Sequence, residues 1–173
     1  MKALKNKIKK KKWNAPQAKR KLYKLHSEFV LLRDRRTCQW CGKNGLNPIT
    51  GKPFKFDCSH LLPREILITA FDPMNGQTLC FSCHKVAHFR SWHQNPLAAA
   101  KWIRNKIGDE VCDRLLTLGE TPYEFTEAEA IRIESDLKQK ISALQKQRED
   151  ENRGCSSQPG SKASSLPRQE QAT

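Results

Sequence analysis

Residues 75–88 read NGQTLCFSCHKVAH, in which a Cys-x-x-Cys pair follows an Asn and precedes two His residues four positions apart. A tetrahedral zinc site takes four ligands, and it accepts both thiolates and imidazoles. A second Cys-x-x-Cys pair, Cys38 and Cys41, lies upstream. Because the two pairs already supply four thiolates, His84 and His88 remain for another site. The sequence therefore predicts two sites, one structural and one catalytic.

The structural site is predicted to be a shared zinc. Each pair can chelate the ion from one tight turn, and Gly42 permits such a turn after the first pair. The pairs enclose 38 residues, more than the 15–20 typical of a compact zinc ribbon. A looped-out segment that contains His60 and Asn75 is therefore expected between them. Four unrelated cysteines are the alternative. The predicted zinc ligands are Cys38, Cys41, Cys80 and Cys83.

Composition bounds the class of protein. The chain has 173 residues, 37% of them hydrophobic, so one compact domain with polar tails is expected. No apolar run approaches the ~18 residues of a membrane span, and the N-terminus lacks the apolar segment of a signal peptide. Seven Cys is an odd number, which fits metal-bound thiolates in a reducing compartment better than secreted disulfides. We expect a soluble cytoplasmic protein with no membrane partner. Cys58, Cys112 and Cys155 are left without a role.

The positive charge is concentrated at the N-terminus. The formal net charge is +14, yet residues 1–24 hold 11 of the 32 Lys and Arg and none of the 18 Asp and Glu. Such a segment is typical of an arm that binds a polyanion. Nucleic acid is the first candidate, and a solubilising leader or a segment that binds anionic lipid is the alternative.

Apolar periodicity and capping residues predict the secondary structure. The expected elements are a helix over 17–36, short strands within 46–60, a helix from about 81 that carries both His84 and His88, and helices over 96–107, 109–118 and 126–151. The expected organisation is a flexible basic arm (1–24), a zinc-stabilised domain (25–120), a long helix (121–151) and a disordered tail (152–173). Leu137, Ile141 and Leu144 form a seam on the long helix. This seam either joins two chains in a homodimer or packs on its own domain.

Four residues outside the thiols form the catalytic candidate: His60, Asn75, His84 and His88. His84 and His88 would chelate a divalent ion from one helical face. His60 ends the predicted strand, where it can act as a base. Each has a simpler interpretation on its own, as an exposed or packed His, and Asn75-Gly76 alone would predict a turn.

Together these residues resemble the HNH (ββα-metal) nucleases. The stretch typical of that family reads N-x-Q-x-L-C-x-x-C-H, and this chain has Asn75-Gly-Gln-Thr-Leu-Cys80-Phe-Ser-Cys83-His84. The resemblance covers residues 38–93. It implies an α+β fold with a zinc-stapled HNH ββα-metal core and flanking helices. A looser likeness, carried by Asp57-Cys-Ser-His60, the basic N-terminus and the helical end, points to the lambdoid phage Rap (NinG) recombination nucleases.

The resemblance also implies roles for the candidate residues. His60 would be the general base, and Asn75 would hold the loop and orient the His60 ring. His84 and His88 would bind a catalytic Mg²⁺ or Mn²⁺. Many family members carry a further ligand directly before the catalytic His, where this chain has Ser59, so Asp57 is the substitute ligand.

The implied partner is DNA, bound through its backbone without sequence specificity. Trp13 would either stack on an unpaired base or anchor the arm to the core. The predicted contacts are Lys9, Lys10, Lys11, Lys12, Trp13, Lys19, Arg20, Lys21, Arg64 and Lys85.

We therefore expect a phage-encoded, metal-dependent endonuclease. It would cut branched recombination intermediates such as D-loops and Holliday-type junctions in the cytoplasm of the bacterial host. A non-catalytic, structure-selective DNA-binding module with a degenerate HNH site is the first alternative. An RNA-binding zinc protein is the second, because a basic arm does not distinguish DNA from RNA.

Overall fold

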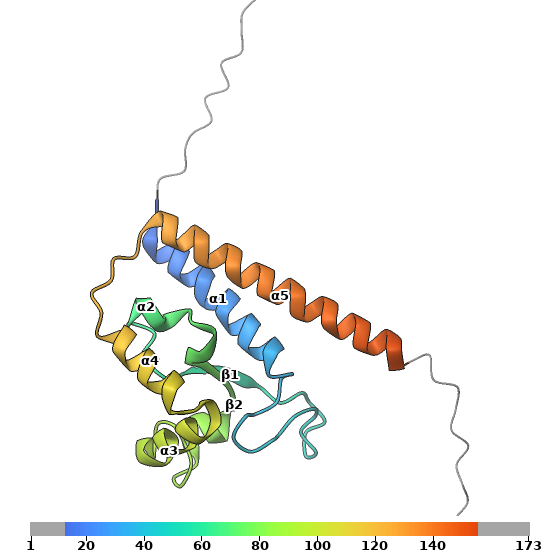
Figure 1. The fold of residues 1–173 in the computed structure, drawn as a ribbon. Helices are drawn as coiled ribbons and strands as arrows, with labels where there is room; N and C mark the ends of the chain where they lie inside the picture. Colours follow the sequence, from blue (N-terminus) through green and yellow to red (C-terminus); the bar gives the residue numbers. More distant parts are fainter. Residues whose placement is uncertain (1–12, 156–173) are drawn as a thin grey trace, which may run out of the picture.

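The computed structural model describes residues 13–155, with the side chains of Gly154 and Cys155 excepted. The elements in this range are α1 (Ala15–Arg33), β1 (Phe56–His60), α2 (Leu67–Ala70), the 3₁₀ helix η1 (Pro73–Asn75), β2 (Gly76–Cys80), the π-helix η2 (Ser82–Val86), α3 (Pro96–Ile107), α4 (Asp109–Gly119) and α5 (Glu127–Cys155). Helices and a small two-stranded sheet make this part of the chain an α+β protein, as the sequence predicted (Figure 1). None of these helices is long and apolar enough to cross a lipid bilayer.

Helix α1 is the support on which the rest of the domain packs. It starts where Asn14 accepts a hydrogen bond from the backbone N–H of Gln17 at 3.0 Å, with Pro16 in the first turn. The second half of the predicted basic arm, residues 15–24, is therefore helical rather than flexible. The residues that α1 buries form one stripe: Leu22, His26, Phe29 and Val30. Lys9 to Lys12 lie outside the described residues.

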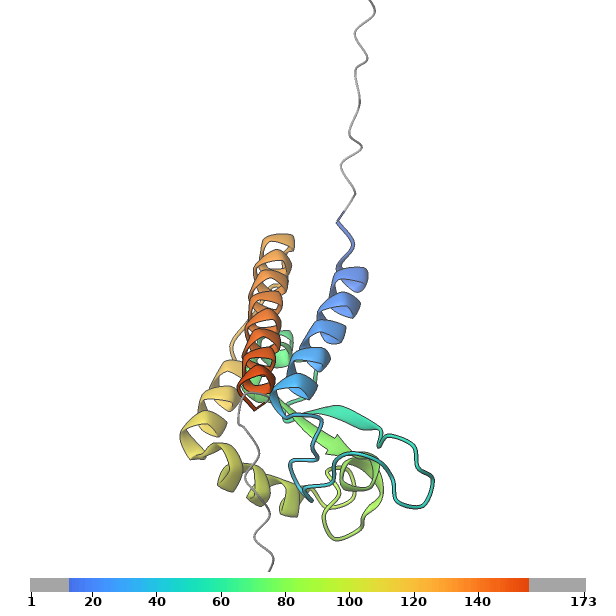
Figure 2. The same ribbon diagram turned by 90° about the vertical axis from the view of Figure 1, so that its right-hand side faces the viewer.

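Helix α5 packs along α1, and the two lie side by side (Figures 1 and 2). Its first turn is capped by Thr126, whose Oγ1 accepts a hydrogen bond from the backbone N–H of Glu129 at 3.2 Å. Leu137 and Ile141 are buried against α1 of the same chain. This packing matches the intrachain interpretation of the seam, and the homodimer stays a prediction. The helix also includes residues 152–155 of the predicted tail, and 156–173 lie outside the described residues.

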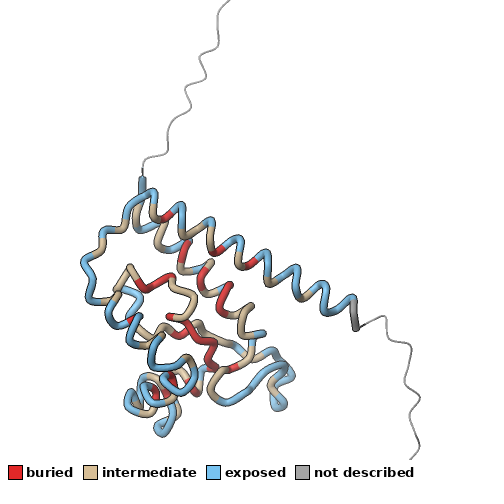
Figure 3. The backbone as a smooth tube through the Cα atoms, viewed as in Figure 1, coloured by how far each residue is buried: buried red, intermediate tan, exposed pale blue. Residues whose placement is uncertain are grey.

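The two strands form an antiparallel hairpin beneath α1. The register pairs Phe56 with Cys80 at one end and His60 with Gly76 at the other. Buried residues concentrate in the centre of the domain, where α1 and the strands meet, whereas the outer face of α5 is exposed (Figure 3). The register therefore places His60 beside Asn75, although 14 residues separate them in the sequence.

Gly76 is required by close packing and not by a turn. Its backbone is extended, with φ −130° and ψ 140°, so the Asn75-Gly76 pair does not form the turn that its sequence alone would predict. A Cβ at this position would lie 2.8 Å from Val30 Cγ2, 2.9 Å from His26 Cε1 and 3.0 Å from Cys58 Sγ. All three distances are shorter than ordinary van der Waals contact.

Gly76→Ala is expected to lower the free energy of unfolding by about 1–3 kcal/mol, because the three neighbours must move in a packed core. Urea denaturation followed by circular dichroism measures this change. Gly119→Ala is the matched control, since its Cβ meets a flexible leucine end, Leu62 Cδ1, at 3.3 Å. Equal free energies of unfolding for Gly76→Ala and Gly119→Ala would show that the neighbours of Gly76 can move without loss of stability.

Candidate functional site

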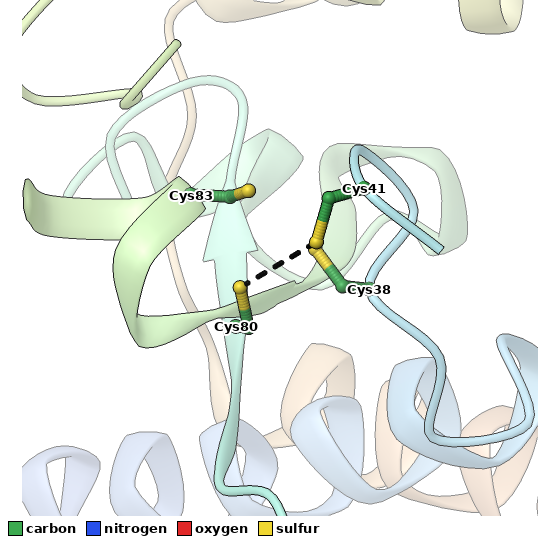
Figure 4. Close-up of side chains that lie close together, drawn as sticks. All are labelled: Cys38, Cys41, Cys80 and Cys83. Carbon is green, nitrogen blue, oxygen red and sulfur yellow. Dashed lines mark hydrogen bonds between the residues drawn. The ribbon is translucent and has the colours of Figure 1, made fainter. Parts of the chain in front are cut away.

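The four predicted zinc ligands come together at the open end of the hairpin. Cys38 and Cys41 lie on a turn after α1, and that turn is fixed to β2 by the hydrogen bond from Gln39 N–H to Thr78 O at 2.8 Å. Cys80 ends β2, and Cys83 lies in η2. The four Sγ atoms all lie within 4.8 Å of one another (Figure 4).

The spacing of the sulfurs fits one tetrahedral ion. Zinc–sulfur bonds of about 2.3 Å at tetrahedral angles place two sulfurs about 3.8 Å apart. The Sγ atoms of Cys41 and Cys80 are 3.8 Å apart. The cluster could thus hold a structural metal ion such as zinc, and four thiolates would leave no position open for substrate.

Burial shapes the chemistry of these thiols. It raises the pKa of Cys38 and of Cys83 above the ordinary value for cysteine. The charged form is disfavoured because it would lose its hydration in the apolar surroundings. A bound cation would supply the missing stabilisation, so metal binding and deprotonation would be coupled at this cluster.

His60 and Asn75 occupy adjacent positions at the closed end of the hairpin. His60 Nε2 lies 3.2 Å from Ala70 O. Since a carbonyl oxygen only accepts, Nε2 carries the proton and Nδ1 keeps its lone pair. Burial lowers the pKa of His60 below its ordinary value of 6.5, with the Ala70 hydrogen bond opposing the effect. The ring is therefore neutral at pH 7.

Asn75 holds the loop that follows β1, as predicted. Its Oδ1 accepts a hydrogen bond from the backbone N–H of Leu62 at 2.7 Å, and its Nδ2 donates to Thr69 O at 2.9 Å. Asn75 is fully buried. The loop in turn contains Ala70, which orients His60. The effect of Asn75 on the His60 ring is thus indirect, through the backbone.

His84 lies at the centre of a second group of side chains. Its Nδ1 is 2.9 Å from Asp57 Oδ2, and its Nε2 is 3.3 Å from His93 Nε2. Burial lowers the pKa of His84 and the Asp57 carboxylate opposes this, so the ring is neutral near pH 7 and donates Nδ1–H to Asp57. The lone pair on Nε2 then faces His93.

The prediction that His84 and His88 share a helical face is wrong. The π-helix η2 ends at Val86, and Ala87 is extended with φ −70° and ψ 110°. The chain then folds back, and the backbone N–H groups of Trp92 and His93 bond to Cys83 O and His84 O at 3.1 and 3.3 Å. This loop replaces His88 with His93 as the neighbour of His84.

Sequence periodicity offered no signal for His93. The eight residues between it and His84 follow neither helical nor strand spacing. Only the concentration of three of the five His residues within 84–93 hinted at a shared site.

Asp57 was predicted to be a metal ligand in place of Ser59, and the structure gives each of the two residues a different environment. Asp57 contacts Nδ1 of His84, on the opposite edge of the ring from the nitrogen that faces His93. This is the usual place of a carboxylate that supports a metal-bound His. Ser59 is 2% exposed, and its Oγ has no hydrogen-bond partner within the described residues.

The predicted DNA contacts divide into two groups. Lys19 lies over the Phe125 ring, Lys21 pairs with Glu134 at 2.7 Å, and Trp13 packs on Phe125 with ring centroids 6.0 Å apart. These contacts anchor the start of α1 to the core. The other described candidates line a shared surface groove or approach the His84 group. Arg20 and Arg64 line the groove together with Tyr23, Lys24 and Arg36, and Lys85 Nζ is 4.0 Å from Asp57 Oδ2.

Comparison with family models, with characterised proteins and with solved structures gave no match to this chain.

Proposed function

We propose that this protein is a metal-dependent endonuclease of the HNH type that hydrolyses DNA phosphodiester bonds, with branched recombination intermediates as its substrates. The four-cysteine cluster would hold a structural zinc, and Mg²⁺ or Mn²⁺ would serve at the catalytic centre. The proposal rests on the hairpin, which presents a neutral histidine base at one strand end and an imidazole pair after the other strand.

The observation that carries the proposal is the His84–His93 contact. Metal–nitrogen bonds of about 2.0–2.1 Å place two imidazole nitrogens on one cation about 2.9–3.4 Å apart, depending on the coordination geometry. The two Nε2 atoms are 3.3 Å apart. Asp57 on Nδ1 of His84 would fix the ring and increase its basicity as a ligand. The proposed ligands are therefore His84 and His93.

His60 is suited to activate the attacking water. Its Nε2–H is held by Ala70 O, so Nδ1 is the nitrogen that would accept the proton. The oxygen of that water would form the new bond to phosphorus while the bond to the 3′ oxygen breaks. The cation would stabilise the charge that develops on the phosphate and on the departing oxygen.

The positive surface supports a nucleic-acid substrate. Arg20 and Arg64, from α1 and from the loop after β1, line one groove together with Lys24 and Arg36. Cationic side chains on a shared groove would track a phosphate backbone without reading its sequence. Tyr23 lies in the same groove with Arg64 Cζ 5.8 Å from its ring centroid, and Arg64 would have to move for an unpaired base at a branch point to stack there.

Variants of the three histidines in 84–93 test the proposed ligands. His84→Ala and His93→Ala are each expected to reduce Mg²⁺-dependent cleavage of a labelled four-way junction by at least about 10-fold, because each removes a cation ligand. His88→Ala, which lies in the same loop without joining the group, should cleave as the unmodified protein does. Equal loss in all three variants, or loss in His88→Ala alone, would contradict the assignment. Absence of cleavage in both Mg²⁺ and Mn²⁺, as in EDTA, would exclude the nuclease.

Ser59 favours one second candidate, a DNA-binding module without turnover. The residue before the proposed base offers a buried hydroxyl, with no partner in the described part of the chain, instead of a carboxylate or imidazole. A centre with two imidazoles would bind Mg²⁺ weakly, since Mg²⁺ prefers oxygen ligands. Tight junction binding without cutting in either metal would support this candidate, and Ser59→Asp would then be expected to increase the affinity for Mn²⁺.

A further inference from the structure

His26 is a buried histidine that the proposed reaction does not use. It lies on α1 with no solvent exposure, beside His60 with ring centroids 5.1 Å apart. Its Nδ1 is 3.8 Å from Cys58 Sγ. One ring nitrogen of His26, one of His60 and the Cys58 sulfur all lie within 4.8 Å of one another. Three ligand atoms of the types that zinc accepts therefore converge at one point.

Each histidine uses one ring nitrogen in a hydrogen bond and keeps the other nitrogen for a metal. His26 Nε2 is 3.0 Å from Asp72 O, and His60 Nε2 is 3.2 Å from Ala70 O. Each ring therefore donates Nε2–H to a carbonyl of the same short segment and keeps a lone pair on Nδ1. A metal-bound His is typically held in this way, with its other nitrogen donating to a backbone carbonyl or carboxylate.

We propose that His26, Cys58 and His60 form a second metal site, separate from the four-cysteine cluster, that binds a thiophilic divalent cation of the Zn²⁺ class. One sulfur and two imidazoles suit zinc and disfavour Mg²⁺, which prefers oxygen ligands. Bonds of about 2.3 Å to sulfur and about 2.0–2.1 Å to nitrogen place the two atoms about 3.6 Å apart on a tetrahedral ion. The 3.8 Å from Cys58 Sγ to His26 Nδ1 needs only a small adjustment.

The three ligand side chains are neutral at pH 7 until a cation binds. Burial lowers the pKa of His26 to about 4, so its ring keeps a lone pair for a metal at pH 7. Burial raises the pKa of Cys58 to about 12, so without a cation this side chain is a neutral thiol. Binding forms the metal–sulfur bond and releases the thiol proton to solvent. Cys58 and His60 are only half-buried, which gives the cation a route of entry.

Occupancy of the site would switch the proposed nuclease off. The cation would take the Nδ1 lone pair of His60, which the proposed reaction needs to accept a proton from water. This consequence rests on the proposed function, whereas the binding itself does not.

Cobalt absorption tests the binding. The full chain is first loaded with one equivalent of Zn²⁺ to fill the four-cysteine cluster. Unbound Zn²⁺ is then removed, and the protein is titrated with Co²⁺. A cysteine-to-cobalt charge-transfer band that saturates at one equivalent is expected. Cys58→Ser, which is nearly isosteric, should abolish the band, and His26→Gln should weaken cobalt binding by at least about 10-fold. Cys112→Ser and His88→Gln are the controls and should leave the band unchanged. A wild-type chain without the band, or a Cys58→Ser chain that retains it, overturns the site.

Zinc inhibition tests the consequence separately. Junction cleavage in Mg²⁺ by the unmodified protein should be lost as Zn²⁺ is added, whereas Cys58→Ser should remain active at the same Zn²⁺ concentration. Equal inhibition of both proteins would overturn the regulatory role even where the cobalt band is present. Absence of cleavage in every condition would contradict the proposed function, and the cobalt result would still decide the site.

Discussion

A chelator that strips the four-cysteine cluster is expected to unfold the β1–β2 hairpin and the loops attached to it. Structural zinc sites contribute about 10 kcal/mol or more, which is comparable with the whole stability of a domain at about 5–15 kcal/mol. Three of the four tryptophans pack around this cluster, and Trp40 stacks on Trp102 with centroids 4.8 Å apart. Metal removal should therefore shift tryptophan fluorescence to the red and broaden the thermal transition.

Cysteine variants distinguish the contribution of the four-cysteine cluster to stability from that of the other thiols. Cys83→Ser removes a ligand that is 1% exposed and should reproduce most of the effect of the chelator. Cys112→Ser changes a thiol outside the cluster and should alter the free energy of unfolding by less than about 0.5 kcal/mol. If the chelator changed neither fluorescence nor melting, the four thiols would be an ordinary part of the core. The pair formed by α1 and α5 has its own buried residues, so its helicity should largely persist.

His60→Ala is expected to reduce junction cleavage by about 10²–10⁴-fold, the usual contribution of a general base, and to leave junction affinity unchanged. Cleavage of a labelled four-way junction in Mg²⁺ and a binding titration in EDTA measure the two quantities. His60→Gln is the matched variant, because its side-chain amide can still donate to Ala70 O. The same loss of rate in both variants would assign the effect to proton transfer. Full activity of either variant would exclude His60 as the base.

The pH dependence of cleavage follows from the surroundings of His60. Burial lowers its pKa below 6.5, so protonation removes the base only at pH values below that. The cleavage rate should stay constant from pH 8 to pH 7 and fall only once the pH drops below about 6.5. A rate that already falls between pH 8 and pH 7 would indicate a base with a higher pKa.

Much of the local structure could be read from the sequence. Capping residues and apolar spacing indicated helices at the positions of α1, α3, α4 and α5, because these signals act within a few residues of one another. The alternation up to His60 likewise predicted β1. The prediction from the sequence failed for the segment after Cys83. Its apolar and polar residues permit a helix, yet the chain forms one π-helical turn and folds back from Ala87.

The sequence by itself determined the four-cysteine cluster, because two Cys-x-x-Cys pairs specify their chemistry through residue type and short spacing. The role of Asn75 in holding the loop beside His60 was expected only from the resemblance to the HNH nucleases, since Asn75-Gly76 alone predicts a turn. Only the tertiary structure decided which histidine joins His84, since the return of the chain from Ala87 to His93 depends on hydrogen bonds to Cys83 and His84. It alone brought His26 to Cys58 and His60, across 32 and 34 residues of sequence. Contacts of this kind arise when α1 packs on the hairpin, and no periodic pattern within either segment encodes them.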